Sequence, residues 1–152
     1  MTRPSSAARL TLVVRRTIRA TPERLFAAWT QPAQLRRWWG PEGVRCVGAE
    51  VDLRVGGRYR IDNALPDGKL LSIVGEFEAV EPPHRLVYTW QVDGASGTLE
   101  RVGVRFQADP GGSTEVVVTH ERIGDEALRE QHRRGWEGCL KGLAEHLTTG
   151  QV

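Results

Sequence analysis

The segment from Asp125 to Thr149, DEALREQHRRGWEGCLKGLAEHLTT, carries the longest helical pattern in the chain. Its apolar residues recur at intervals of three, four and seven positions and therefore form one stripe along a helix. The stripe consists of Leu128, Trp136, Cys139, Leu140, Leu143 and Leu147. Asp125 is a suitable N-cap. We predict one long C-terminal helix with a single apolar face.

Three glycines, Gly135, Gly138 and Gly142, interrupt this predicted helix. Each costs a helix interior about 1 kcal/mol relative to alanine, so another requirement must compensate. Two explanations fit the glycines: the helix lies close to a sheet, or the missing side chains leave space for a ligand.

Most of the chain before this helix follows the two-residue period of β-strands. The alternating segments cover residues 10–19, 44–51, 58–62, 71–79, 86–92, 101–106 and 116–121. Turn sequences separate several of them, including PDG at residues 66–68 and a predicted turn at residues 94–97. We expect about seven strands in an antiparallel sheet, because short turns join neighbouring antiparallel strands.

A helical region interrupts the strands after the first one. Thr21 is a suitable N-cap, and Pro22 is favoured at the first helical position. Pro32 starts a second short helix that runs to Trp38 and ends at Gly40. The sequence thus predicts an α+β fold in which one layer of helices packs on a curved sheet.

Composition favours a small globular protein. The chain has 152 residues, enough for one domain with a core, and 26% of them are charged. We expect a flexible N-terminal tail over residues 1–9 and a single domain over residues 10–149. The net charge of +2 comes from scattered arginines and does not favour nucleic acid as a partner.

The sequence also favours a cytoplasmic location. It has no apolar signal-peptide segment and no run long enough to cross a membrane. Cys46 and Cys139 belong to no CxxC pair, so we expect both to be reduced core thiols rather than a disulfide.

Several segments resemble one family in order along residues 10–148. They are RATPERLFAAWT at residues 19–30, LRRWWGP at 35–41, DLRVGGRY at 52–59, EPPHRLVYTW at 81–90, and Gly135-Trp136 with Leu140. This pattern is similar to the C-terminal-domain-like group of the heat-shock-protein-90 ATPase activator, within the START-like (Bet v 1-like, SRPBCC) superfamily. The resemblance implies a helix-grip fold, in which a seven-stranded antiparallel sheet curls around the C-terminal helix and leaves a cavity between them.

The resemblance further implies binding of a small hydrophobic or amphipathic ligand. Some members are enzymes of polyketide-cyclase or hydrolase type, and the activator itself acts on a chaperone, so an enzyme and a chaperone-interaction module are the two alternatives. The group has no common catalytic motif to transfer, and we assign no catalytic residue and no cofactor. The sequence contains neither a GxGxxG nor a GxSxG motif.

The candidate ligand-binding residues are large or polar side chains on the predicted inward faces. They are Trp38, Tyr59, Ile73, Tyr88, Trp90, Phe106, His120, Trp136 and Leu140. A plain core is the alternative, but one helix fills the concave side of a curved sheet poorly. Consecutive helical residues point about 100° apart, so we do not expect both Trp38 and Trp39 to lie deep in the core. Either both pack structurally against loops, or one packs inward and the other lines a pocket mouth or a homodimer interface.

Two polar residues share faces with apolar neighbours. His120 is either a hydrogen-bonded core histidine or a ligand-orienting group or general base, acting with Tyr59 or Tyr88 in the enzyme alternative. Arg16 has inward parity and, if buried, needs an anion such as Glu78, Glu100 or an acidic ligand.

Metal binding is not expected. His132, Cys139 and His146 recur every seven residues, but seven helical residues rise about 10.5 Å, and zinc needs all its ligands about 2 Å away. We therefore predict no metal site.

Overall fold

The computed structural model describes residues 9–41, 43–93 and 99–149. The predicted turn at residues 94–97 and all but the last residue of the predicted tail lie outside this part of the chain. Within it, no helix is both long and apolar enough to cross a membrane.

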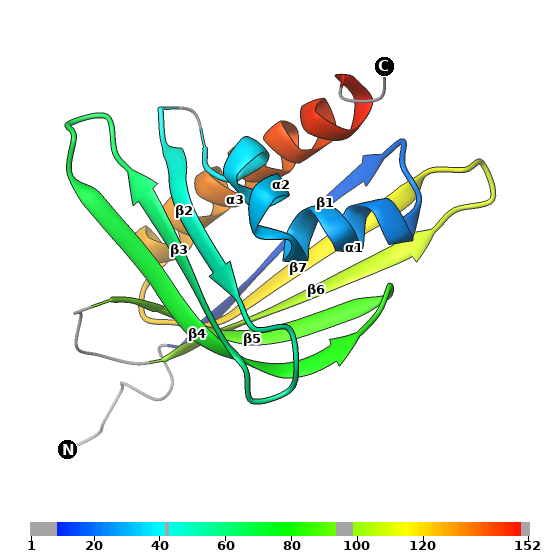
Figure 1. Ribbon diagram of the computed structural model, residues 1–152. Coiled ribbons are helices and arrows are strands. Elements are labelled where there is room, and N and C mark those ends of the chain that lie inside the picture. Colours follow the sequence, from blue (N-terminus) through cyan, green and yellow to red (C-terminus); the bar gives the residue numbers. More distant parts are fainter. Residues whose placement is uncertain (1–8, 42, 94–98, 150–152) are drawn as a thin grey trace.

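Seven strands and three helices make up the described fold (Figure 1). In chain order they are β1 (Leu10–Ile18), α1 (Pro22–Thr30), α2 (Pro32–Trp38), β2 (Arg45–Val51), β3 (Arg58–Ala64), β4 (Leu70–Glu81), β5 (Arg85–Val92), β6 (Glu100–Ala108), β7 (Thr114–Ile123) and α3 (Glu126–Thr149). The strands form one sheet in the order β1-β7-β6-β5-β4-β3-β2, and every neighbouring pair is antiparallel. The predicted α+β helix-grip fold is confirmed.

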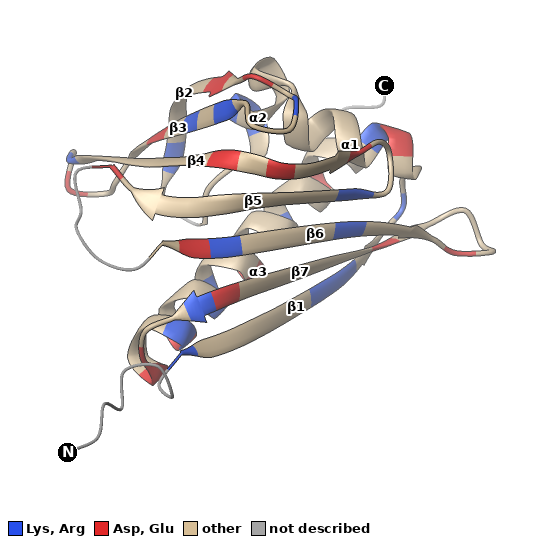
Figure 2. Ribbon diagram, turned by 90° about the horizontal axis from the view of Figure 1, so that it is seen from below, with Lys and Arg blue, Asp and Glu red and all other residues tan. Residues whose placement is uncertain are grey.

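All three helices lie on one side of the curved sheet, and the other side is left uncovered (Figure 2). Charged residues are spread along the strands of the sheet in this view. On the covered side the predicted stripe of α3 packs into the core: Trp136, Cys139, Leu140, Leu143 and Leu147 are all buried, and Leu128 is partly buried. Apolar burial against the sheet therefore holds α3 in place.

The helix starts follow the local sequence. Thr21 Oγ1 accepts a hydrogen bond from the backbone N–H of Arg24 at 3.2 Å and caps α1. Asp125 Oδ1 accepts one from the backbone N–H of Leu128 at 2.8 Å at the start of α3. Both predicted N-caps are confirmed.

The expectation for the Trp38-Trp39 pair is wrong, because both side chains are buried, with exposed fractions of 3% and 6%. Trp39 has left the helix: its φ and ψ are −68° and 136°, which is extended backbone. The helical angle of about 100° between neighbours therefore does not apply. Trp38 Nε1 donates to the carbonyl oxygen of Ala28 at 2.8 Å.

Arg16 is also not buried, although it has inward parity. It lies on β1, an edge strand of the sheet, and its long side chain reaches water. It therefore needs no buried anion. Of the two acids considered for it, Glu78 pairs with Arg101 at 2.7 Å, and Glu100 binds two histidines.

The expectation that the α3 glycines allow close approach to the sheet is wrong at Gly142, and the surroundings of Gly135 are different. A Cβ added at Gly142 would lie 2.9 Å from the carbonyl oxygen of Trp38, so the close neighbour is α2 and not the sheet. A Cβ added at Gly135 would meet no atom within 4 Å, and Gly135 lines a cavity.

This difference predicts opposite effects of the same substitution. Gly135→Ala should raise the free energy of unfolding by about 0.5–1 kcal/mol, because alanine is the better helix former and has room. Gly142→Ala should lower it by about 1–3 kcal/mol, because the added methyl overpacks against backbone. Urea denaturation of both variants measures the two changes in the free energy of unfolding. A change of the same sign in both would contradict the different surroundings of Gly135 and Gly142.

Candidate functional site

A cavity of about 300 Å³ lies between the sheet and α3. The sheet contributes Asn63, Leu71, Ile73, Trp90 and Val92. The helix contributes Leu128, Gln131, His132, Gly135, Trp136 and Cys139. Trp39, Pro41, Val44 and Leu65 come from the connections between elements. The lining is mostly apolar with a few polar groups, which is typical of small-molecule pockets.

A cluster of indole rings separates this cavity from the rest of the interior. The ring of Trp136 is 5.5 Å from those of Trp39 and Trp90 and 6.0 Å from that of Trp29, centre to centre. The centre of the covered side is therefore filled with aromatic side chains. The cavity lies toward one end of the interior, beside the first half of α3.

The predicted ligand-binding residues divide into three groups. Ile73, Trp90 and Trp136 line the cavity. Tyr59 and Tyr88 line a separate void of only about 20 Å³, which has room for about one water molecule. The remaining candidates are core residues: Trp38, Phe106, His120 and Leu140 are buried and do not line the cavity. Strand parity identified the inward face correctly but carries no information on the position of the cavity.

Sequence reasoning missed several lining residues. Trp39 lines the cavity in place of the candidate Trp38, because its backbone turns out of α2. His132 lies one turn before Trp136 and outside the apolar stripe. Asn63 had a usable signal: it follows Tyr59 and Ile61 on the inward face of β3, so it is a polar residue among apolar ones, as His120 is on β7.

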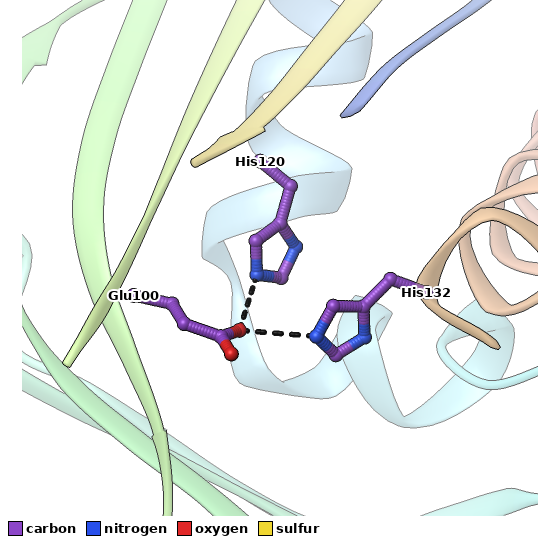
Figure 3. Close-up of side chains that lie close together, drawn as sticks. All are labelled: Glu100, His120 and His132. Atoms are coloured by element: carbon purple, nitrogen blue, oxygen red, sulfur yellow. Dashed lines mark hydrogen bonds and ion pairs between the residues drawn. The ribbon is translucent and has the colours of Figure 1, made fainter. Parts of the chain in front are cut away.

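Beside the cavity, Glu100 joins two histidines (Figure 3). One oxygen of Glu100, Oε1, lies 2.7 Å from His120 Nε2 and 3.0 Å from His132 Nε2. The two imidazoles are stacked, with centres 4.3 Å apart and planes 18° apart. His120 comes from β7, Glu100 from β6 and His132 from α3, so the cluster ties the helix to two strands.

The other nitrogen of His120 determines where its proton lies. Trp136 Nε1 is 3.0 Å from His120 Nδ1, and an indole N–H can only donate. Nδ1 is therefore the acceptor, and the neutral ring carries its proton on Nε2 and donates it to Glu100. Both nitrogens of His120 are engaged by protein groups.

The titration of this cluster follows from its burial. Burial lowers the pKa of His120 below its usual 6.5, against the opposing effect of Glu100, so the ring stays neutral. Burial also acts to raise the pKa of Glu100, but the hydrogen bonds from His120 and His132 outweigh it and bring the pKa to about 2. The carboxylate is therefore ionised and held by N–H groups of both histidines.

The same three residues place potential metal-ligand atoms within 4.8 Å of one another. The hydrogen bonds do not fit a metal centre. A metal-bound histidine donates its second N–H to an acceptor, whereas His120 Nδ1 faces the donor Trp136. Binding a metal through Nε2 would leave that ring with no proton on either nitrogen, so we assign the cluster as a hydrogen-bonded support for α3.

A second hollow, of about 480 Å³, lies on the uncovered side of the sheet. Both acids of its lining are paired with Arg101, Glu78 at 2.7 Å and Glu121 at 3.8 Å. It offers little apolar surface for a ligand, so the cavity under α3 is the candidate site.

Comparison with known proteins gives consistent results. Residues 19–148 match the model of a family described as Activator of Hsp90 ATPase homolog 1-like protein. A crystal structure of a protein from Chromobacterium violaceum is 29% identical, with a TM-score of 0.81, over 88% of this chain and 94% of that chain. The AHSA1 protein from Silicibacter pomeroyi is 27% identical, with a TM-score of 0.81, over 93% of this chain and 100% of that chain.

DynU16, described as a protein in the dynemicin biosynthetic locus, is 25% identical with a TM-score of 0.75. That match covers 92% of this chain and 48% of DynU16, so the present chain spans about half its length. A comparison with the curated proteins gives no match.

Proposed function

Because the chain belongs to the family of Activator of Hsp90 ATPase homolog 1-like proteins, within the START-like superfamily, we propose that it binds a small hydrophobic or amphipathic molecule in the cavity beneath α3. Family and fold support a ligand-binding domain in general terms. The observation that supports the specific proposal is the pocket of about 300 Å³ between the sheet and α3, with walls that are mostly apolar and aromatic. A concave site of this volume with a few polar groups among apolar walls is typical of small-molecule binding.

The enzyme alternative assigned acid–base work to His120 and a tyrosine. The contacts of His120 favour binding instead: its side chain is fully buried, and both ring nitrogens are occupied by Glu100 and Trp136. Tyr88 is buried and accepts a hydrogen bond from Trp29, and Tyr59 donates to the carbonyl oxygen of Thr89. These groups have no contact with the cavity through which to act on a ligand.

Filling the cavity tests the proposal. A ligand that binds only the folded state raises the melting temperature by mass action. At a ligand concentration of 100 times Kd, it adds about 2.7 kcal/mol to the free energy of unfolding. We expect a library of small apolar and aromatic compounds to contain members that stabilise the wild-type protein. Gly135→Leu, which projects a side chain into the open space at Gly135, should abolish that response.

Gly135→Ala is the matched control, because it makes the same helix-favouring change with little loss of volume, and it should keep the response. A library that leaves the wild-type melting temperature unchanged, or a Gly135→Leu variant that responds as the wild type does, would rule out this cavity as the binding site. A chaperone-interaction role would depend on exposed surface, and Gly135→Leu would leave it intact.

A further inference from the structure

Two arginines face each other across neighbouring strands of the sheet. Arg85 on β5 lies directly opposite Arg105 on β6, and basic segments of these two strands lie side by side in Figure 2. Like charges directly opposite one another destabilise a sheet, so this pair needs an explanation.

The arginine pair is an exception among the described strands. The other four cross-strand pairs in which both residues are charged each join an arginine to a glutamate: Glu50 with Arg60, Arg58 with Glu76, Glu81 with Arg85, and Arg101 with Glu121. The register of the sheet therefore places opposite charges together in these pairs and like charges together only at Arg85 and Arg105.

Both arginines line the hollow of about 480 Å³ on the uncovered side of the sheet. Gly103, two residues before Arg105 on the same face of β6, also lines the hollow and supplies no side chain to fill it. A Cβ added at Gly103 would have Val87 as its nearest neighbour, at 3.9 Å. The two arginine side chains therefore border open space that a small molecule can occupy.

The two ends of the hollow differ in charge. At one end, the Arg101 side chain pairs with both glutamates of the lining. At the other end, Arg85 uses Nη1 for a bond to Glu81 at 2.9 Å. Arg105 is exposed and forms no ion pair or hydrogen bond with another described residue. Since a guanidinium carries five N–H donors, this end of the hollow offers unused donors and uncompensated positive charge.

A phosphate group suits this pair of arginines better than a carboxylate does. Guanidinium groups bind phosphate oxygens through paired, charge-assisted hydrogen bonds. A phosphate monoester has three terminal oxygens and a charge of about −1.5 to −2 at pH 7, so it can accept from two guanidinium groups and compensate both charges. A carboxylate has two oxygens and a single charge, which match one guanidinium.

The neighbouring residues limit the size and the charge of the anion. Glu78 and Glu121 line the hollow, and Glu81 lies beside Arg85. These carboxylates repel further negative charges, which disfavours nucleic acid and anionic membrane surfaces as ligands. Val87 and Val117 provide a small apolar surface within the lining, so the phosphate can carry a small organic group.

We propose that this hollow binds a small phosphate monoester whose phosphate group lies between Arg85 and Arg105. Binding replaces the repulsion between the two guanidinium groups with attraction to a shared anion. The site is distinct from the cavity beneath α3, because the two share no described lining residue.

Phenyl phosphate, inorganic phosphate and benzoate are the probes, titrated at one constant ionic strength by calorimetry and by NMR. The wild-type protein should bind phenyl phosphate about tenfold or more tightly than benzoate. It should bind phenyl phosphate about threefold or more tightly than inorganic phosphate, because the ring adds apolar contact. Phenyl phosphate should shift the backbone amide signals of Arg85, Gly103 and Arg105 and leave that of Gly135, in the cavity beneath α3, unchanged.

Arg105→Gln should weaken the binding of phenyl phosphate about fivefold or more, because one of the two guanidinium groups is lost. Arg58→Gln is the matched control, since it makes the same change at an exposed arginine of β3 that lies opposite Glu76 and outside the hollow. It should keep the affinity within about twofold of the wild type, because a distant exposed charge is screened by salt.

Arg105→Glu tests the repulsion in the absence of ligand. It places a carboxylate opposite Arg85 and should raise the urea midpoint above that of Arg105→Gln at low salt. It should also abolish the binding of phenyl phosphate. A midpoint below that of Arg105→Gln would show that Arg85 gains nothing from an anion at this position and would overturn the proposal.

The binding measurements can overturn the proposal in other ways. Phenyl phosphate bound no more tightly than benzoate, an equal loss of affinity in Arg105→Gln and Arg58→Gln, or an amide shift at Gly135 in place of Arg105 would each exclude this site. Equal binding of phenyl phosphate and inorganic phosphate would overturn the ester as the ligand. The cavity beneath α3 is tested independently, by the Gly135→Leu variant.

Discussion

Replacing Glu100 by alanine is expected to lower the free energy of unfolding at pH 7 by about 2–3 kcal/mol. The loss follows from the neighbours of Glu100 rather than from its own exposure. His120 Nε2–H is fully buried and has Glu100 Oε1 as its acceptor, and His132 uses the same oxygen. Without the carboxylate, a buried N–H is left without an acceptor, and the link from α3 to β6 and β7 is broken.

Glu100→Gln is the informative companion, because the amide oxygen still accepts from a histidine while the charge is gone. Glu100→Gln should lower the free energy of unfolding by about 1 kcal/mol, which is less than the loss in Glu100→Ala. Urea denaturation measures both. Glu130→Gln, on the exposed part of α3, is the control and should stay within about 0.5 kcal/mol of the wild type. An alanine variant as stable as the control would contradict the role assigned to the cluster.

The pH dependence of stability is the second consequence of this cluster. The pKa of Glu100 is about 2 in the folded protein against an ordinary 4.5. The unfolded chain therefore binds more protons between these values, and the stability from Glu100 is present above pH 4.5 and lost as the pH falls toward 2. His120 acts in the same direction. Its pKa in the folded protein is lowered from 6.5, so the unfolded chain takes up a proton first as the pH falls below 6.5, and the free energy of unfolding decreases.

Glu100→Gln should therefore flatten the decline of stability between about pH 4.5 and 2 relative to the wild type. The decline that begins near pH 6.5 should remain, because His120 is still buried. Urea midpoints measured from pH 7 to pH 2.5 test this, and parallel curves for the two proteins would exclude Glu100 as the source of the acid sensitivity.

Gly75→Ala is expected to have the other large effect, a loss of about 3 kcal/mol or more of unfolding free energy, at the upper end of overpacking costs. A Cβ at Gly75 would lie 2.0 Å from the carbonyl oxygen of Thr89 on β5 and 2.7 Å from the ring of Tyr59. Tyr59 lies opposite Gly75 in the β3–β4 pair, and its hydroxyl donates to that same carbonyl at 2.6 Å. The added methyl would therefore push apart three strands that form the sheet wall of the interior.

Gly103→Ala is the matched control, since it makes the same change in a strand where the nearest atom, on Val87, is 3.9 Å away. It should change stability by less than about 1 kcal/mol. Denaturant midpoints of the two variants provide the comparison. Similar effects at both positions would show that Gly75 is not required by close packing.

Local periodicity was sufficient for the architecture. The alternation along the strands and the three-, four- and seven-residue spacing of the α3 stripe follow from backbone geometry, which repeats along each segment regardless of its neighbours. The number of strands, their antiparallel pairing, the N-caps at Thr21 and Asp125, and the buried face of α3 were therefore all predictable. So was the inward orientation of Ile73, Trp90 and Trp136.

The arrangement of the candidate site depends on contacts between segments far apart in the chain. The alternation along a strand indicates which of its faces the helices cover. How completely they cover it depends on how three helices pack on the curved sheet. The position of the cavity and the oxygen of Asn63 that lacks a partner among the described residues could therefore not be predicted from the sequence. Trp39 is buried because its backbone turns out of α2. Glu100, His120 and His132 meet only when β6, β7 and α3 come together, because hydrogen bonds across elements depend on position in space and leave no fixed spacing in the sequence.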